Sequence, residues 1–154
     1  MTLLLVIVMA CTALVSCGNS DLDTGVFSVE APSGWELQKR TVDGSEKDDQ
    51  VYAIKGKAET TSYPHILIIY YKNPSEYKDE RSFYKDAKDV SAVEAGDRKW
   101  EGYRYSLFGS EEACLTAKEG DGLWVCKFTL EKGGEKIEID EKDVKDILSS
   151  LKLK

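Results

Sequence analysis

Two cysteines in the second half of the chain have a spacing that permits a disulfide. Cys114 and Cys126 lie on two mainly apolar stretches joined by a turn at 119–122. With a three-residue loop that sets Lys118 opposite Gly122, the cysteines face each other across an antiparallel pair, where opposed Cα atoms lie about 4.5–5.5 Å apart. That separation suits a disulfide, so we predict a Cys114–Cys126 bond that stabilises the fold by about 2–3 kcal/mol. The alternative is a facing pair of buried, reduced thiols.

The rest of the chain offers little catalytic or metal-binding chemistry. Its single histidine, His65, opens an apolar run after Pro64, and we expect it to be structural. Two thiols with no nearby histidine do not complete a tetrahedral zinc site. The sequence has no nucleophile-elbow, phosphate-loop, zinc-protease or dinucleotide-binding motif. We therefore expect no enzymatic activity, no cofactor and no metal.

Adjacent acidic residues are the remaining candidates for hydrolytic chemistry. The pairs Asp48-Asp49 and Glu111-Glu112 fall in predicted turns, where we expect solvated carboxylates. A glycosidase needs two carboxylates that face each other across a cleft. A cell-envelope hydrolase with such a pair is the enzymatic alternative to a binding function.

Aromatic residues provide a possible recognition surface. A groove for a sugar or a peptide would be lined by Trp35, Trp100, Tyr103, Tyr105 and Trp124. The same side chains can instead fill the core, which we favour for a domain of this size because large aromatic side chains dominate core packing.

The N-terminal segment predicts export and membrane attachment. Residues 3–15 are uncharged and almost entirely apolar. As a helix they span about 20 Å, short of the roughly 30 Å hydrocarbon core, which suits a signal peptide better than a membrane-spanning helix. The following residues 14–18, Leu-Val-Ser-Cys-Gly, resemble the lipobox of bacterial lipoproteins. In that family the cysteine thiol receives diacylglycerol and the leader is removed just before it.

The lipobox resemblance implies a signal peptide at 1–16, a lipid-modified Cys17, and a protein held on the outward face of a bacterial membrane. Two acyl chains are enough for stable anchoring, whereas one gives only marginal binding. Cys11 offers a competing match with a shorter apolar segment, and an ordinary cleaved leader with a free thiol is the other alternative. Residues 18–25 are small, polar and acidic, so 17–25 are expected to be the lipidated cysteine and a flexible tether.

The composition limits the kinds of partner that we expect the protein to bind. The 154-residue chain carries 28 acidic and 21 basic residues, a net charge of −7. Such a charge repels phosphate backbones and anionic lipid surfaces, so we expect no nucleic acid partner and no purely electrostatic membrane binding. Hydrophobic residues make up 42% of the chain, enough for one globular domain at 26–154.

Periodicity predicts a mixture of strands and helices in this domain. Residues 65–71 form the most apolar run after the leader and are bounded by prolines. Such a run indicates a central strand buried on both faces, which we expect helices to cover. Apolar spacing predicts a helix at 75–90, or two short helices within that span, and a helix at 140–151 with Asp140 as its N-cap. Alternating segments between 91 and 139 predict an antiparallel meander.

Three short segments are similar to the PsbP-like lipoproteins and secreted domains of bacteria. They are Val26-Phe27-Ser28-Val29-Glu30-Ala31-Pro32-Ser33-Gly34-Trp35, then Lys99-Trp100-Glu101-Gly102-Tyr103, and finally Ile147-Leu148-Ser149-Ser150-Leu151-Lys152-Leu153. The resemblance implies an α+β fold in which an antiparallel sheet of about six strands is flanked by helices, an α/β/α sandwich.

The same resemblance implies a function without a shared catalytic residue set. We expect a membrane-anchored binding or accessory module whose partner is an envelope protein, a polymer or a small ligand. A purely structural envelope protein is a further alternative.

Overall fold

A computed structural model describes residues 18–57 and 59–154 of the chain. The expected signal peptide at 1–16 and the expected lipidation site Cys17 lie outside the described residues. Among the helices of the described part, none combines the length and the apolar character that crossing a bilayer requires.

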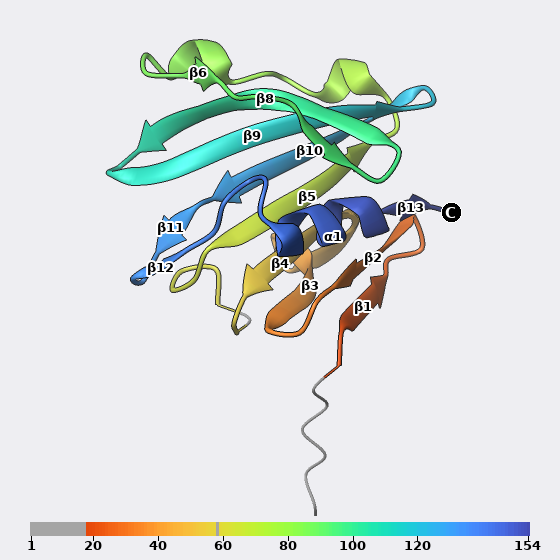
Figure 1. Ribbon diagram of the computed structural model, residues 1–154. Helices are drawn as coiled ribbons and strands as arrows, with labels where there is room; N and C mark the ends of the chain where they lie inside the picture. The colour runs from red at the N-terminus through yellow and green to blue at the C-terminus, as the bar shows by residue number, and fades with distance from the viewer. Residues whose placement is uncertain (1–17, 58) are drawn as a thin grey trace, which may run out of the picture.

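An 8-stranded antiparallel sheet dominates the fold (Figure 1). Its order is β3-β4-β5-β10-β9-β8-β6, and β7 pairs with β8 beside this path. The strands are β3 (Trp35–Val42), β4 (Ser45–Lys55), β5 (His65–Tyr71), β6 (Lys88–Asp89), β7 (Val93–Ala95), β8 (Arg98–Leu107), β9 (Ser110–Glu119) and β10 (Gly122–Thr129). The predicted central strand at 65–71 is confirmed, because β5 lies between β4 and β10 in this sheet.

Smaller elements complete the described part. A three-stranded sheet combines β1 (Ser20–Asp23), β2 (Phe27–Ala31) and β13 (Lys152–Leu153), and a short hairpin combines β11 (Glu131–Lys132) and β12 (Glu135–Lys136). The helix α1 (Lys142–Ser150) confirms the predicted C-terminal helix, although Glu141 and not Asp140 is its N-cap. Residues 20–23, expected to be part of a flexible tether, instead form β1, because Leu22 packs against the core.

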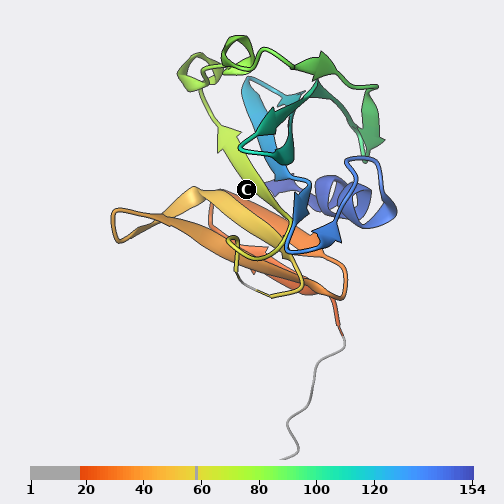
Figure 2. The ribbon, with the colours of Figure 1, turned by 90° about the vertical axis from the view of Figure 1, so that its left-hand side faces the viewer.

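The main core lies between one face of the curved sheet and the elements that cover it, α1 and β2 (Figure 2). Ile66 and Ile68 of β5 are fully buried there. They share this cluster with Phe27 of β2 and with Ile147 and Leu148 of α1. The amphipathic helix therefore covers the sheet as its i, i+3, i+4 pattern predicts.

The other face of the sheet is covered by an irregular segment. The single helix predicted at 75–90 is wrong. Two short helices do occur there, but each is one 3-10 turn: η1 (Pro74–Glu76) and η2 (Arg81–Phe83). Tyr77, Tyr84 and Ala87 each pack separately against the apolar cluster on this face of the sheet. The backbone is extended at both tyrosines. The buried members of this cluster are Ile69, Tyr103, Tyr105, Cys114 and Val125.

The expected fold class is therefore wrong. The described part is mostly β, and a large sheet with one α-helix on one face is not an α/β/α sandwich of about six strands flanked by helices. A strand buried on both faces requires cover on both sides, but an irregular segment that carries large aromatic side chains supplies it as well as a helix does.

Candidate functional site

The hairpin that carries the two cysteines has a different register from the one expected. Its loop holds two residues, so Cys114 lies opposite Lys127 and Cys126 lies opposite Leu115. Since successive side chains of a strand point to opposite faces, the two thiols lie on opposite sides of the sheet, and both are free. The predicted Cys114–Cys126 disulfide is wrong, because a change of one residue in register moves a side chain to the other face.

Neither thiol is arranged as a nucleophile. Cys114 lies beside a hollow of about 420 Å³, with its Sγ 3.5 Å from the hydroxyl of Tyr77. Burial raises the pKa of the Cys114 thiol and also that of Cys126, which is fully buried. A reactive cysteine needs a lowered pKa, so these residues serve as apolar packing groups.

The five aromatic residues considered for a groove are divided between the two faces. Trp35, Trp100 and Trp124 belong to the main core, whereas Tyr103 and Tyr105 belong to the cluster on the opposite face. All five are at most 9% exposed. The structure therefore does not bring them together in one groove, and they fill the two cores.

A second hollow lies at one edge of the sheet, beside the turn of the β8–β9 hairpin. It measures about 480 Å³ and lies where the 86–90 segment, the β8–β9 hairpin and β11 meet. We call it the edge hollow, and its wall includes Asp86, Lys88, Arg104, Tyr105, Glu111 and Glu131. Tyr105 is held in place by stacking on Tyr84, with ring centroids 3.8 Å apart.

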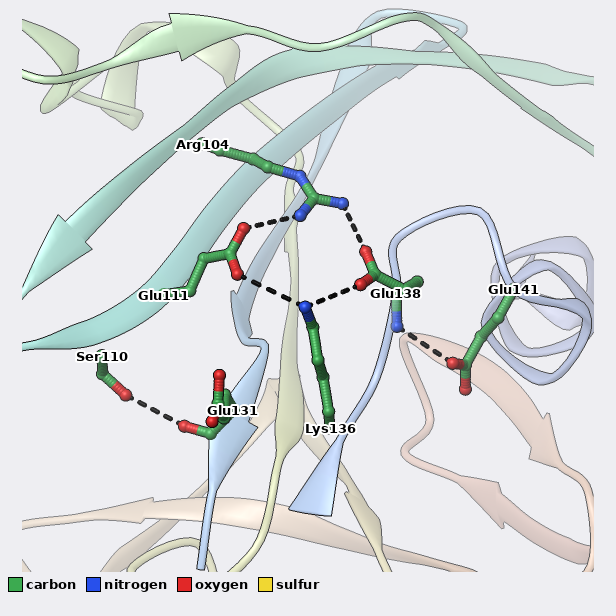
Figure 3. Close-up of polar contacts among 7 residues, drawn as sticks. All are labelled: Arg104, Ser110, Glu111, Glu131, Lys136, Glu138 and Glu141. Carbon is green, nitrogen blue, oxygen red and sulfur yellow. Dashed lines mark hydrogen bonds and ion pairs between the residues drawn. The ribbon is translucent and has the colours of Figure 1, made fainter. Parts of the chain in front are cut away.

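Arg104 and Glu111 in this wall belong to a network of four alternating charges with Lys136 and Glu138 (Figure 3). Arg104 donates from its two terminal nitrogens to Glu111 and Glu138, at 2.7 Å each. The Lys136 Nζ lies 3.1 Å from Glu138 and 3.8 Å from Glu111. The bonds from Arg104 and Lys136 lower the pKa of Glu138. Arg104 lies on β8 and Glu111 on β9, so this network joins these two strands to residues 136 and 138, which lead into α1.

The adjacent carboxylates Glu111 and Glu112 do not face each other across a cleft. Glu111 and Glu112 are adjacent on β9 and therefore point to opposite faces. Burial raises the pKa of Glu112, which accepts a hydrogen bond from Thr129, but Glu112 does not line the edge hollow. Asp86 does line it, and hydrogen bonding from Ser106 lowers its pKa. Glu112, the carboxyl whose pKa is raised, therefore lies outside the lining of the edge hollow.

The other residues considered for chemistry have structural partners. The Nδ1 of His65 lies 2.9 Å from the carbonyl oxygen of Tyr63, to which it donates as the Nδ1–H tautomer, and burial lowers the imidazole pKa. Asp48 forms an exposed ion pair with Lys39. Within residues 18–57 and 59–154, no group of three or more His, Cys, Asp or Glu side chains is arranged to hold a metal ion.

Phe108 is the most unusual residue near the edge hollow. It occupies the two-residue turn of the β8–β9 hairpin, next to Gly109 in the wall, and its side chain is 101% exposed. Its φ is +50° and that of Gly109 is +80°. Both turn residues therefore have left-handed backbone, which is unfavourable for a bulky side chain.

The β3–β4 hairpin provides an internal comparison for this turn. There Val42 pairs with Ser45 across Asp43-Gly44, just as residues 107 and 110 pair across Phe108 and its glycine. The φ values of Asp43 and Gly44 are +50° and +76°, so the two turns have nearly the same φ values at both residues. Asp-Gly is a preferred pair for this type of turn and Phe-Gly is not.

The sequence analysis did not single out Phe108, which lies inside the stretch 91–139 predicted as an antiparallel meander. The available signal was a phenylalanine directly before Gly109 at the end of an alternating segment, where asparagine or aspartate is favoured. Its exposure could not be deduced, because whether another segment covers a turn depends on the tertiary fold.

Comparisons with known proteins give a distant structural likeness only. No family model matches the chain, and none of the curated proteins matches it. The fold is similar to a crystal structure from Bacteroides thetaiotaomicron VPI-5482, with 16% sequence identity and a TM-score of 0.49. That match covers 90% of this chain and 49% of the other, so the chain spans about half the length of the solved structure that it resembles.

Proposed function

We propose that this chain is a lipid-anchored, outward-facing binding module of a bacterial envelope, and that it binds through the end that carries Phe108 and the edge hollow. The observation that carries the binding assignment is Phe108, a fully exposed aromatic side chain held in left-handed backbone beside a hollow. Leu107 beside it is exposed as well, and contiguous exposed apolar side chains mark interaction sites.

The arrangement of the described part suits this role. The first described residues lie at the lower end of the coloured ribbon in both views, whereas the β8–β9 hairpin lies in its upper part (Figures 1 and 2). An anchor on Cys17 would therefore hold the binding end away from the membrane and leave it free to meet a partner.

The anchor is tested by fractionation of bacteria that express the full chain. We expect the wild-type protein in the membrane fraction and Cys17→Ser largely in the soluble fraction, because the diacylglycerol attachment point is lost and the body is acidic. Cys11→Ser is the matched control and is expected to stay with the membrane. Equal membrane retention of Cys17→Ser and wild type would contradict the anchor.

The binding end is tested by photo-crosslinking in intact cell envelopes. A photoreactive phenylalanine analogue in place of Leu107 is expected to form covalent adducts with a partner. The same analogue in place of Val42, at the matching position of the β3–β4 turn, is expected to form far fewer. Equal adduct yields at the two positions, or none at Leu107, would contradict the proposed binding end.

A further inference from the structure

We infer that Phe108 is the residue that anchors this contact, and that it inserts into an apolar socket of a folded partner protein whose rim carries basic side chains. The inference rests on the proposed function, since it names the contact residue and the partner chemistry of the same end.

The turn itself gives no reason for a phenylalanine at this position. In the described part of the chain, three two-residue turns have positive φ at both residues, and the other two use Asp43-Gly44 and Gly133-Gly134. These are pairs that such turns prefer. A bulky side chain in left-handed backbone is disfavoured, so local structure would be better served by aspartate, asparagine or glycine.

The core gives no reason for it either. The Phe108 side chain is 101% exposed, and its neighbour Leu107 is exposed as well. By contrast, every other phenylalanine apart from Phe83 is fully buried. A side chain that neither the turn nor the core requires is explained by a contact outside the chain, as strained backbone at interaction sites often is. Aromatic residues are enriched among the anchors of protein interfaces.

The surrounding charges select the partner. The charged residues that line the edge hollow beside Phe108 are Asp86, Asp89, Glu111, Glu131, Lys88 and Arg104. Asp89 pairs with Arg81, and Glu111 pairs with Arg104 and Lys136. The remaining Asp86, Glu131 and Lys88 leave this end with a small negative excess. An anionic lipid surface would be repelled by this end. A second copy of the chain, with its net charge of −7, would also be repelled. A protein with a basic rim around its socket is the complementary partner.

The test adds variants of Phe108 to the photo-crosslinking experiment at position 107. We expect Phe108→Asn to lower the adduct yield at least tenfold, as the loss of an anchor residue does, and Phe108→Leu to lower it less. The melting temperature of Phe108→Asn should equal or exceed that of wild type, because asparagine suits the turn. Asp43→Asn is the matched control and should change neither quantity. Raising NaCl from 50 to 500 mM should lower the adduct yield several-fold, because salt screens the rim charges.

Each contrary result has a separate meaning. Suppose that adducts form at position 107 but that their yield changes neither with Phe108→Asn nor with NaCl, or fails to change with one of them. The inference is then overturned, while the proposed binding end stands. If no position at this end forms adducts, both fail.

The full chain with Cys17→Ser is also mixed with phosphatidylglycerol–phosphatidylcholine vesicles and measured by sedimentation. Binding to vesicles that depends on Phe108, or a dimer that depends on it, would overturn the inference in favour of lipid or of a second copy.

Discussion

Replacing Trp124 with alanine is expected to lower the free energy of unfolding by about 3–5 kcal/mol, the range for large aromatic side chains removed from a core. Trp124 is fully buried. Its ring centroid lies 5.0 Å from that of Phe27 in an edge-on contact and 4.8 Å from that of Tyr70. Its Nε1–H also donates to Glu119 at 2.5 Å. The substitution removes these contacts together and leaves a cavity where β2 meets the sheet.

Guanidinium chloride unfolding followed by far-ultraviolet circular dichroism measures this loss. Trp124→Phe keeps part of the ring volume but not the N–H donor, so it should lose less. Phe83→Ala is the matched exposed control, because Phe83 is 79% exposed, and it should change stability by less than about 0.5 kcal/mol. A loss below about 1 kcal/mol for Trp124→Ala would mean that β2 does not pack on the sheet as described.

Elements defined by local pattern could be predicted from the sequence. The apolar run that follows Pro64 becomes β5, since a continuous run between breakers suits a strand buried on both faces. The spacing of Val144, Ile147 and Leu148 becomes the buried face of α1. In both cases the pattern itself specifies which side chains need cover.

The cover of the second face could not be predicted in the same way. Tyr77, Tyr84 and Ala87 have a spacing that also fits a helix, but the sequence does not show that each contacts the sheet separately. The backbone is extended at Tyr77 and Tyr84, so the helical period is accidental. Pattern alone cannot separate these outcomes, because both bury the same residues.

The candidate site could not be predicted, because its position depends on the register of single residues and on the order of the strands. The turn at 119–122 allows a loop of two or three residues, and the choice reverses the relative faces of Cys114 and Cys126. The edge hollow joins segments from 86 to 131, and its position follows only from the order of strands in the sheet. Phe108 lay within reach of sequence reasoning, since Asp43 shows what the same turn normally contains.

Removing the carboxylate of Glu119 is the second change with a large expected effect on stability. Its Oε2 accepts hydrogen bonds from the Arg98 Nε at 2.8 Å and from the Trp124 Nε1 at 2.5 Å. The Arg98 side chain is only 12% exposed and also donates to the Leu151 carbonyl at 2.8 Å. Glu119→Ala would leave a largely buried guanidinium and a buried indole N–H without this acceptor. We expect a loss of about 2–3 kcal/mol, below the full cost for a completely buried pair because Glu119 itself is partly exposed.

Two further variants separate the charge of Glu119 from its hydrogen bonding. Glu119→Gln keeps an acceptor for the indole N–H but not the negative charge, so its loss in the same unfolding measurement should lie between those of wild type and Glu119→Ala. Asp146→Ala breaks the exposed i, i+4 pair with Lys142 and should cost at most about 0.5 kcal/mol. If Glu119→Ala were no more costly than Asp146→Ala, the Arg98–Glu119 pair would be solvated like a surface pair. The attachment of the C-terminal residues to the sheet would then depend on apolar packing and on the bonds of Asp143 with Trp35 and Lys55.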